Sequence, residues 1–318
     1  MQNKYISFDG WWGGLNNIRM TYEMAAAISV ITNRKLIIPP KIYCLFLSEH
    51  DQKETFFDFW ELFDKELFYQ YFDCIDYYDV KDYHKYESDI QYYDNICEDI
   101  KCLPETEHPN WGVNGETYSS PLNVFYLNHK DKYIHFPRNL FGHWYHLIGG
   151  ITLKDREVIK YKLKHGLKLK SKFNQRFIST PYNAIHARSG DFNQTRPDST
   201  VSLFSNLREM VDAKLTPDKP LFIATDENNR KLFECLNGYN CYYLSDFIST
   251  DMVSSIAYDT LMCAGADLFY GSRFSTFTDY INIIRYYQGK KNCSKNLLNY
   301  RFNGNESFSW ENCFVNEY

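Results

Sequence analysis

The sequence predicts an α/β protein with two Rossmann-like, doubly wound domains. Two observations carry this prediction. A strand, a glycine-rich loop, a helix and a second strand follow one another near the N-terminus, and strands alternate with helices from residue 183 to residue 289. Both patterns are typical of parallel sheets covered by helices. We expect one domain over 1–150, a bridging helix over 151–178, a second domain over 179–290, and a tail over 291–318 that packs back on the body.

The composition narrows the function classes. The chain has 318 residues, 44% of them hydrophobic, and a net charge of -5. An acidic balance argues against a general binder of nucleic acids or anionic membranes. No apolar run approaches the roughly 20 residues of a membrane span. The chain leads from Met1 almost directly into a strand, so we expect no signal peptide and a cytoplasmic protein.

The nine cysteines are scattered without the spacing of zinc sites. The closest pairs are Cys97 with Cys102 and Cys235 with Cys241, and neither matches the CxxC pattern. We therefore expect free, mostly buried thiols in a reducing compartment.

The first expected strand, Lys4 to Phe8, leads into the glycine-rich loop Asp9 to Gly14. A helix follows, with Asn16 or Asn17 as its N-cap, and the strand Lys35 to Ile38 comes next. The glycines do not fit the G-x-G-x-x-G pattern, which disfavours a dinucleotide site. Two interpretations stay open for this loop: a helix N-terminus that binds an anion or a sugar, or a tight turn.

Residues 43–125 are the least readable part of the chain. Helical stretches are expected over 56–71, and the segment could line an acceptor groove or form a divergent helical insertion. A strand is expected over Tyr133 to Phe136. The histidines that follow, together with the one in that strand (His135, His143, His146), have no metal-site spacing, so we expect packing or polar surface roles.

The C-terminal half alternates clearly. Strands are expected over 183–187, 220–225, 241–244 and 267–270. Helices are expected from a cap at Ser199 or Thr200 to about 211, over 227–236, over about 254–264, and from the segment after Gly271 to a stop at Gly289.

Parallel strands share one carboxyl edge, so residues that follow them meet there. His186, Arg188, Asp226 and the serines and threonine of the last loop (Ser272, Ser275, Thr276) are expected at this edge. An arginine, a helix N-terminus and a carboxylate together favour a nucleotide site. The alternative is structural: an Arg188–Asp191 ion pair and ordinary helix caps.

Several segments resemble the GDP-fucose protein O-fucosyltransferase superfamily and its bacterial and viral relatives. Gly13 to Met20, with Arg34 to Pro40, is similar to the family's G-[FL]-N-[NQ]-x-R segment. His186 to Asp191 is similar to H-x-R-x-G-D. Ala224 to Asp226, followed by Gly271 to Phe277, is similar to the donor-site pair. The resemblance implies a GT-B-like fold, in which two Rossmann-like domains face a cleft, and inverting, metal-independent transfer.

The resemblance also implies roles for the C-terminal, donor-binding domain. Arg188 would hold the β-phosphate and stabilise the leaving diphosphate. His186 and Asp226 would contact the nucleoside. The remaining donor contacts, to the phosphates and the base, would come from Ser275, Thr276 and Phe277.

The N-terminal domain is the acceptor side in this resemblance. Gly14, Asn16 and Asn17 would approach the transferred sugar, and Asn17 would belong to the catalytic set with Arg188 and Asp191. The general base stays open between Asp9, Glu23, Asp191 and no protein base at all.

The chain contains no D-x-D pair, the motif with which metal-dependent transferases hold Mn²⁺. We therefore expect no metal or other cofactor. The sequence predicts a glycosyltransferase that moves a sugar, most simply fucose from GDP-fucose, to a hydroxyl of a glycan or protein. Two alternatives stay open: a binding protein without turnover, and a transferase that uses another nucleotide sugar.

Overall fold

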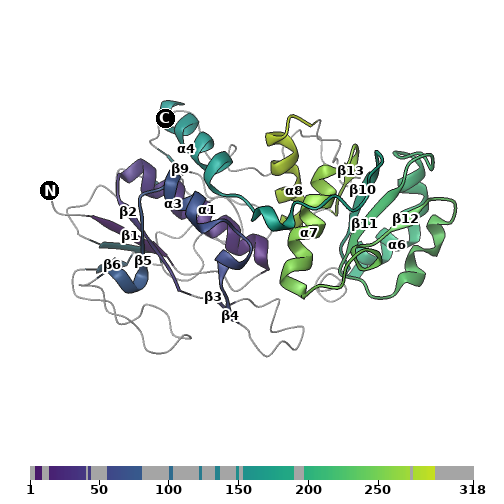
Figure 1. Ribbon diagram of the computed structural model, residues 1–318, viewed down its shortest axis with the longest axis horizontal. Coiled ribbons are helices and arrows are strands. Elements are labelled where there is room, and N and C mark those ends of the chain that lie inside the picture. Colours follow the sequence, from purple (N-terminus) through teal and green to yellow (C-terminus); the bar gives the residue numbers. More distant parts are fainter. Residues whose placement is uncertain are drawn as a thin grey trace. The chain divides into compact units, whose positions relative to one another are not determined.

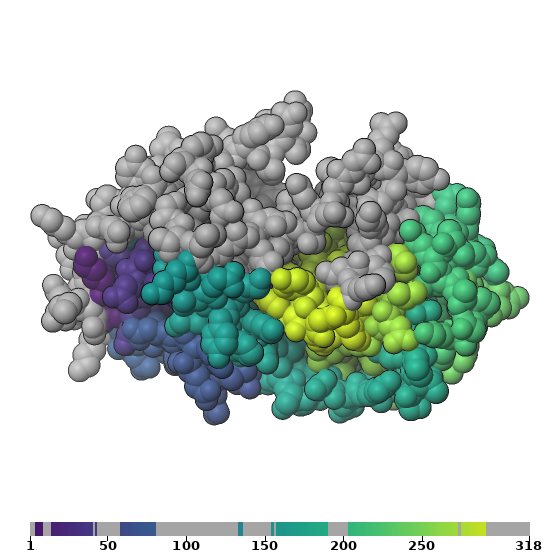
Figure 2. All heavy atoms as spheres, turned by 90° about the horizontal axis from the view of Figure 1, so that it is seen from above, coloured from purple at the N-terminus to yellow at the C-terminus, as the bar shows by residue number. Residues whose placement is uncertain are grey.

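The computed structural model describes residues 4–8, 14–40, 42–43, 56–80, 100–102, 122–123, 133–136, 148–149, 153–189, 197–272 and 275–290 (Figures 1 and 2). These residues divide into two compact units, one ending at Leu169 and the other beginning at Lys170. None of the described helices is long and apolar enough to cross a membrane.

The first unit is built on a five-stranded sheet in the order β5-β2-β1-β8-β6, with every pair parallel. The strands are β1 (Tyr5–Phe8), β2 (Lys35–Ile38), β5 (Cys74–Asp76), β6 (Ile100–Cys102) and β8 (Tyr133–Phe136). The strands expected near 4–8, 35–38 and 133–136 are therefore confirmed. The expected βαβ unit forms because helix α1 (Leu15–Thr32) connects β1 to its parallel neighbour β2.

Helix α1 is covered on almost all of its surface, which explains its many small and apolar residues. Its aromatic residue Tyr22 meets Phe8 edge-on and stacks on Phe59 with ring centroids 3.8 Å apart. The N-cap prediction was wrong. Gly14 is the N-cap and makes no side-chain cap bond, while Asn16 and Asn17 already lie inside the helix. Asn33 closes the helix in the left-handed conformation.

The segment that was hardest to read contains short elements. Two strands pair antiparallel, β3 (Ile42–Tyr43) with β4 (Phe56–Phe57), and two pair parallel, β7 (Leu122–Asn123) with β9 (Ile148–Gly149). The 3-10 turns η1 (Phe59–Glu61) and η2 (Tyr77–Asp79) flank the helix α3 (Lys65–Tyr71). Helical stretches were expected over 56–71, and two are present, each started by an aspartate side chain, Asp58 and Asp64, while residues 56–57 form a strand instead.

The helix expected as a bridge over 151–178 is shorter. It is α4 (Leu153–Gly166), which lies within the first unit and packs against α3 and α1. The following 3-10 turn η5 (Ser171–Phe173) belongs to the second unit. The chain changes units between Leu169 and Lys170.

The second unit contains a parallel sheet in the order β12-β11-β10-β13. Its strands are β10 (Asn183–Ala187), β11 (Leu221–Thr225), β12 (Cys241–Tyr242) and β13 (Phe269–Tyr270). Its longer helices are α6 (Pro197–Asp212), α7 (Met252–Gly265) and α8 (Thr276–Tyr287), and the expected helix over 227–236 is the 3-10 segment η6 (Arg230–Leu236). The 3-10 turn η7 (Leu244–Asp246) begins at the last residue of the expected strand 241–244, which is shorter in the structure.

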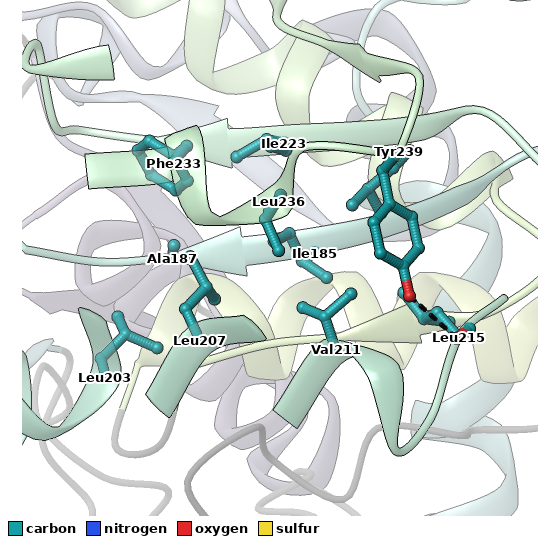
Figure 3. Packing of buried hydrophobic residues seen from close by; sticks show 11 residues of the cluster. Ile185, Ala187, Leu203, Leu207, Val211, Leu215, Ile223, Phe233, Leu236 and Tyr239 are labelled. Atoms are coloured by element: carbon teal, nitrogen blue, oxygen red, sulfur yellow. Dashed lines mark hydrogen bonds between the residues drawn. The ribbon is translucent and has the colours of Figure 1, made fainter. Parts of the chain in front are cut away.

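The two faces of this sheet are covered by different helices (Figure 1). Strand alternation sends Ile185 and Ala187 to the face covered by α6 and η6, where they meet Leu207 and Val211 in the apolar core of Figure 3. Tyr239 closes one end of this core and donates its hydroxyl proton to the Leu215 carbonyl oxygen at 3.0 Å. The other face, which carries His186, is covered by α7 and α8.

Arg285 fixes α8 against the end of α7. This side chain is fully buried, and its guanidinium donates to the carbonyl oxygens of Ala264, Ala266 and Asp267. The carbonyls at the C-terminus of α7 are satisfied in this way by a charge that also suits the helix dipole. The C-terminal ends of α7 and α8 therefore lie together.

The expectation of mostly buried thiols was wrong for the described cysteines, because only Cys263 is buried. Cys74, Cys235, Cys241 and Cys263 are all free.

Candidate active site

The loops that follow β10 and β13 are joined through one serine. The Ser272 hydroxyl donates to the carbonyl oxygen of His186 at 2.9 Å and accepts the backbone N–H of Arg188 at 2.8 Å. Ser272 is itself buried. The chain is thus fixed on both sides of Ala187, the last residue of β10, and the half-buried Arg188 side chain starts from a rigid backbone.

The loop after β11 is hydrogen-bonded to the loop after β10. Asp226 accepts the backbone N–H of Ser189 at 2.7 Å through Oδ1, and the Ser189 hydroxyl donates to Glu227 at 3.0 Å. Thr225 donates to the Ala187 carbonyl oxygen at 2.6 Å. The structure therefore brings the ends of β10, β11 and β13 together at one edge, as parallel strands require. One carboxylate oxygen of Asp226 holds this edge together.

His186 precedes Arg188 by two residues and is 6% exposed. Its Nδ1 is 2.9 Å from the Thr278 hydroxyl, and its ring centroid is 4.7 Å from that of Phe277. Burial, followed by the positive charge of Arg188, lowers the pKa of His186 to about 3. The imidazole is therefore neutral at physiological pH and can offer one N–H donor and one acceptor nitrogen.

The N-terminus of α8 supplies the last part of the site. Ser275 is the N-cap and accepts the backbone N–H of Thr278, so Thr276 and Phe277 occupy the first turn. Backbone N–H groups and the helix dipole favour an anion at such an end. Gly271 is required here, because a Cβ at this position would lie 2.3 Å from Thr278 atoms.

Asp259 is a candidate that sequence reasoning missed. It lies in the middle of α7, and its Oδ1 is buried without a hydrogen-bond partner among the described residues. Burial raises the pKa of this carboxyl to about 8. A buried carboxylate with an unused acceptor is costly unless a ligand completes it. The only sequence signal was an aspartate inside an otherwise apolar helix.

The position of Asp259 follows from the directions of the helices. Tyr182, just before β10, donates to the Met262 carbonyl oxygen at 2.7 Å, so α7 ends near the amino edge of the sheet. Asp259 precedes Cys263 by one turn, and its charge adds to burial in raising the pKa of the Cys263 thiol. The carboxylate consequently lies on the same sheet face as His186, partway toward the carboxyl edge.

The residues expected from the first unit lie in the first turn of α1. Asn16 is buried and Asn17 is half-buried. Gly14 has a negative φ of -69°, and a Cβ there would meet only Asn17 Oδ1 at 3.8 Å. Neither backbone conformation nor packing against the described residues requires glycine at this position.

Glu23, one of the possible bases, is 2% exposed and forms an ion pair with Arg19 at 2.6 Å on the same helix. Such a buried pair stabilises α1 internally and leaves the carboxylate without access to a solvent-borne substrate. The other possible bases, Asp9 and Asp191, lie outside the described residues. Over the described parts of the chain, no three His, Cys, Asp or Glu side chains cluster as metal ligands would.

Comparison of the fold with solved structures gives a consistent result. POFUT1 bound to GDP matches with a TM-score of 0.54 at 14% identity, over 91% of this chain and 97% of that chain. POFUT1 bound to GDP-fucose matches with a TM-score of 0.53 at 14% identity, over 92% and 96% of the two chains. The fucosyltransferase NodZ from Bradyrhizobium matches with a TM-score of 0.50 at 13% identity, over 89% and 94%.

No family model and no curated protein sequence matches the chain. The likeness is therefore one of fold, and it extends over nearly the whole chain and nearly the whole of each matched protein. The predicted α/β class with two parallel sheets is confirmed. The chain has a GDP-fucose fucosyltransferase-like fold.

Proposed function

We propose that this protein is a glycosyltransferase that moves fucose from GDP-fucose to a hydroxyl group of a glycan or protein. The observation that carries the proposal is the edge of the second unit, where Arg188, neutral His186 and the N-terminus of α8 converge. The fold shared with proteins solved with GDP and GDP-fucose supports the choice of donor.

The proposed reaction breaks the bond between the sugar anomeric carbon and the diphosphate oxygen. The acceptor oxygen attacks the opposite face of that carbon, which inverts its configuration, and the bond electrons leave with GDP. Negative charge grows on the diphosphate as the bond breaks. Arg188 offers two parallel donors to it, and the first turn of α8, including Thr276, offers backbone N–H groups.

Recognition of guanine is assigned to Asp259. Guanine presents two adjacent donors, N1–H and the 2-amino group, that an ionised carboxylate accepts together. Uracil and thymine present one N–H between two carbonyl oxygens, which a carboxylate repels. The buried Oδ1 without a described partner fits the first pattern.

The residues proposed to surround guanine further support its binding at this site. The ring of Phe277 offers a stacking surface beside neutral His186, whose uncharged state avoids repelling base donors. Asp226 is assigned to the ribose side of the nucleoside, with its Oδ1 already bonded to Ser189. Ser275 caps the helix beneath the phosphates.

The acceptor side is assigned to the first unit. Gly14, Asn16 and Asn17 are proposed to face the transferred sugar, with the Asn17 amide orienting it. Asp191 is favoured over Asp9 as the general base because it follows Arg188 by three residues, and Glu23 is disfavoured by its buried ion pair. No cofactor takes part. The free thiols favour a reducing compartment, and we place the activity in the cytoplasm.

Ligand-induced stabilisation tests the donor. GDP, UDP and dTDP, with their sugar derivatives, are compared by thermal shift. A ligand at about 100 times its Kd adds about 2.7 kcal/mol of stability. We expect GDP and GDP-fucose to stabilise the protein and UDP and dTDP to have no effect.

Release of GDP from GDP-fucose then separates an enzyme from a binding protein. A catalytically inactive binder is stabilised by GDP-fucose without releasing GDP in the presence of any acceptor. Stabilisation by UDP- or dTDP-sugars in place of GDP-sugars would identify another donor. Turnover is measured with and without excess chelator, and loss of all activity with chelator would contradict the metal-free mechanism.

A further inference from the structure

Two carboxylates hold Ser189, the residue that directly follows Arg188. The backbone N–H of Ser189 donates to Asp226 Oδ1 at 2.7 Å, and its hydroxyl donates to Glu227 Oε2 at 3.0 Å. Ser189 is fully buried, so both bonds are shielded from solvent at the serine. Any residue except proline could supply the backbone donor, whereas the bond to Glu227 requires a side-chain donor. The chain after Arg188 is therefore held by a contact between two particular side chains.

The Glu227 carboxylate is fixed before it reaches Ser189. Its backbone N–H donates to the Thr225 hydroxyl at 3.1 Å, and its Oε1 accepts the backbone N–H of Asn229 at 2.7 Å. The Thr225 hydroxyl itself donates to the carbonyl oxygen of Ala187, two residues before Ser189. Because the main chain and the side chain of Glu227 are both held locally, little conformational entropy remains to be lost in the bond to Ser189.

The charge of Glu227 is unfavourable for the proposed donor. An anionic side chain bonded to the residue after Arg188 repels a diphosphate that Arg188 binds. Glutamine would keep the hydrogen bonds without the charge, since its amide oxygen can accept the Asn229 N–H and its amide nitrogen can donate to the Ser189 hydroxyl. A single substitution therefore separates the hydrogen bonding of Glu227 from its charge.

We propose that Glu227 is a positioning residue for the transfer reaction, which acts by holding Ser189 and thereby the main chain that carries Arg188. This inference rests on the proposed function. Ser272 holds the N–H of Arg188 and Glu227 holds the next residue, so the guanidinium starts from a main chain fixed at two consecutive residues. Displacement of a reacting group by about 1 Å can cost about a hundredfold in rate. Since the diphosphate gains charge in the transition state, misplacement of Arg188 should lower kcat more than donor affinity.

Removal of the bond from either side tests the proposal. Ser189→Ala, Glu227→Ala and the double variant are compared with the wild type in three measurements: Tm, the Kd for GDP, and GDP release from GDP-fucose with water or free monosaccharides as acceptors. We expect each single variant to lower kcat of the folded protein about tenfold or more, and to change the Kd for GDP less than about threefold. The double variant should lose about as much as one single variant, because both substitutions remove the same bond.

Glu227→Gln provides the rescue, and Asp246→Ala provides the control. With its hydrogen bonds kept, Glu227→Gln should stay within about threefold of the wild-type kcat and bind GDP no more weakly. Asp246 lies in the same unit and also accepts one backbone N–H, from Tyr243 at 2.7 Å, and one side-chain donor, from Arg230 at 3.0 Å. Its removal should leave kcat unchanged.

The outcomes distinguish this inference from the proposed function. Absence of GDP release by the wild type would overturn the proposed function and this inference with it. With an active wild type, this inference alone is overturned by wild-type kcat in Glu227→Ala, by an equal loss in Asp246→Ala, or by no recovery in Glu227→Gln. A lowered Tm with unchanged kcat of the folded fraction would show that the bond between Ser189 and Glu227 is structural only.

Discussion

The Nδ1 of His186 and the hydroxyl of Thr278 lie 2.9 Å apart and join the end of β10 to the first turn of α8. The two residues are 92 positions apart in the sequence. Since the imidazole is neutral and buried, this contact orients its ring and couples the strand that precedes Arg188 to the helix whose N-terminus is the proposed diphosphate site.

Thr278→Val tests this coupling. The substitution keeps the shape of the side chain and removes its hydroxyl, leaving a buried ring nitrogen without its described partner. We expect a loss of about 1–3 kcal/mol in the free energy of unfolding, measured by urea at pH 7.5, and weaker GDP binding. Thr260→Val is the control, because Thr260 is equally buried and, among the described residues, its hydroxyl donates to the carbonyl oxygen of Ile256 in its own helix. Equal losses in both variants, with GDP binding intact, would contradict the coupling.

Gly271→Ala should be damaging for a steric reason. The added Cβ would lie 2.3 Å from Thr278 atoms, so α8 must shift away from β13. We expect a loss of about 1–3 kcal/mol in the free energy of unfolding. Gly14→Ala is the control, since its Cβ meets one atom at 3.8 Å and its φ is negative. Its unfolding free energy should change by less than about 0.5 kcal/mol. A stable Gly271→Ala variant would show that the loop relaxes freely.

Some strands could be predicted in full from the sequence, whereas the long-range contacts at the site could not. β10 and β2 were predicted to the residue, because continuous apolar runs bounded by turn residues leave few alternatives. The gathering of Arg188, Asp226 and Ser272 followed from parallel topology alone. The particular contacts did not, because Ser272 and Thr278 reach β10 across more than 80 residues.

Other failures have local causes. The helix expected over 227–236 is a 3-10 segment, since Asn229 caps it after a turn in which Glu227 is engaged by Ser189 and by the Asn229 backbone N–H. Asp259 was overlooked because composition cannot distinguish an aspartate that faces solvent from one with a buried carboxylate oxygen on the same helix.

Asp259→Asn tests the assignment of that carboxylate through its pH dependence. The folded-state pKa, about 8, is above the unfolded value near 3.9, so the folded state holds its proton more tightly. The stability contribution of the protonated carboxyl is complete below about pH 4 and is lost as pH rises toward 8. We therefore expect the variant to gain stability relative to the wild type between these pH values, by about 1–3 kcal/mol at pH 8.5.

GDP binding should respond in the opposite direction. If the ionised carboxylate accepts guanine donors as proposed, the affinity of the wild type should rise as pH increases through 8, and Asp259→Asn should bind GDP at least about tenfold more weakly at pH 8.5. A gain in stability with loss of ligand is typical of a functional residue. Unchanged GDP affinity in the variant would show that the carboxylate does not contact the base.

Substitution of Arg188 tests the proposed stabilisation of the leaving diphosphate. If its guanidinium bridges the diphosphate, its contribution is larger in the transition state than in the ground state, because charge accumulates as the sugar leaves. Arg188→Lys keeps a positive charge but loses the planar pair of donors. We expect Arg188→Lys and Arg188→Ala each to raise the barrier by on the order of 3 kcal/mol, about a hundredfold or more in kcat.

The melting temperatures of these variants distinguish a catalytic role of Arg188 from a structural one. The backbone of Arg188 is held by Ser272, and that bond survives substitution of the side chain, so both variants should melt within a few degrees of the wild type. A structural pairing of Arg188 with Asp191 predicts the reverse, a lowered Tm with near-normal turnover of the folded fraction. Because Arg188 also helps to lower the pKa of His186, Arg188→Ala should raise that pKa, which NMR titration of the imidazole can follow. Wild-type turnover in Arg188→Ala would remove the basis for transfer by this site, whereas loss of turnover with an intact Tm and a raised His186 pKa would place the guanidinium over the imidazole and at the leaving group.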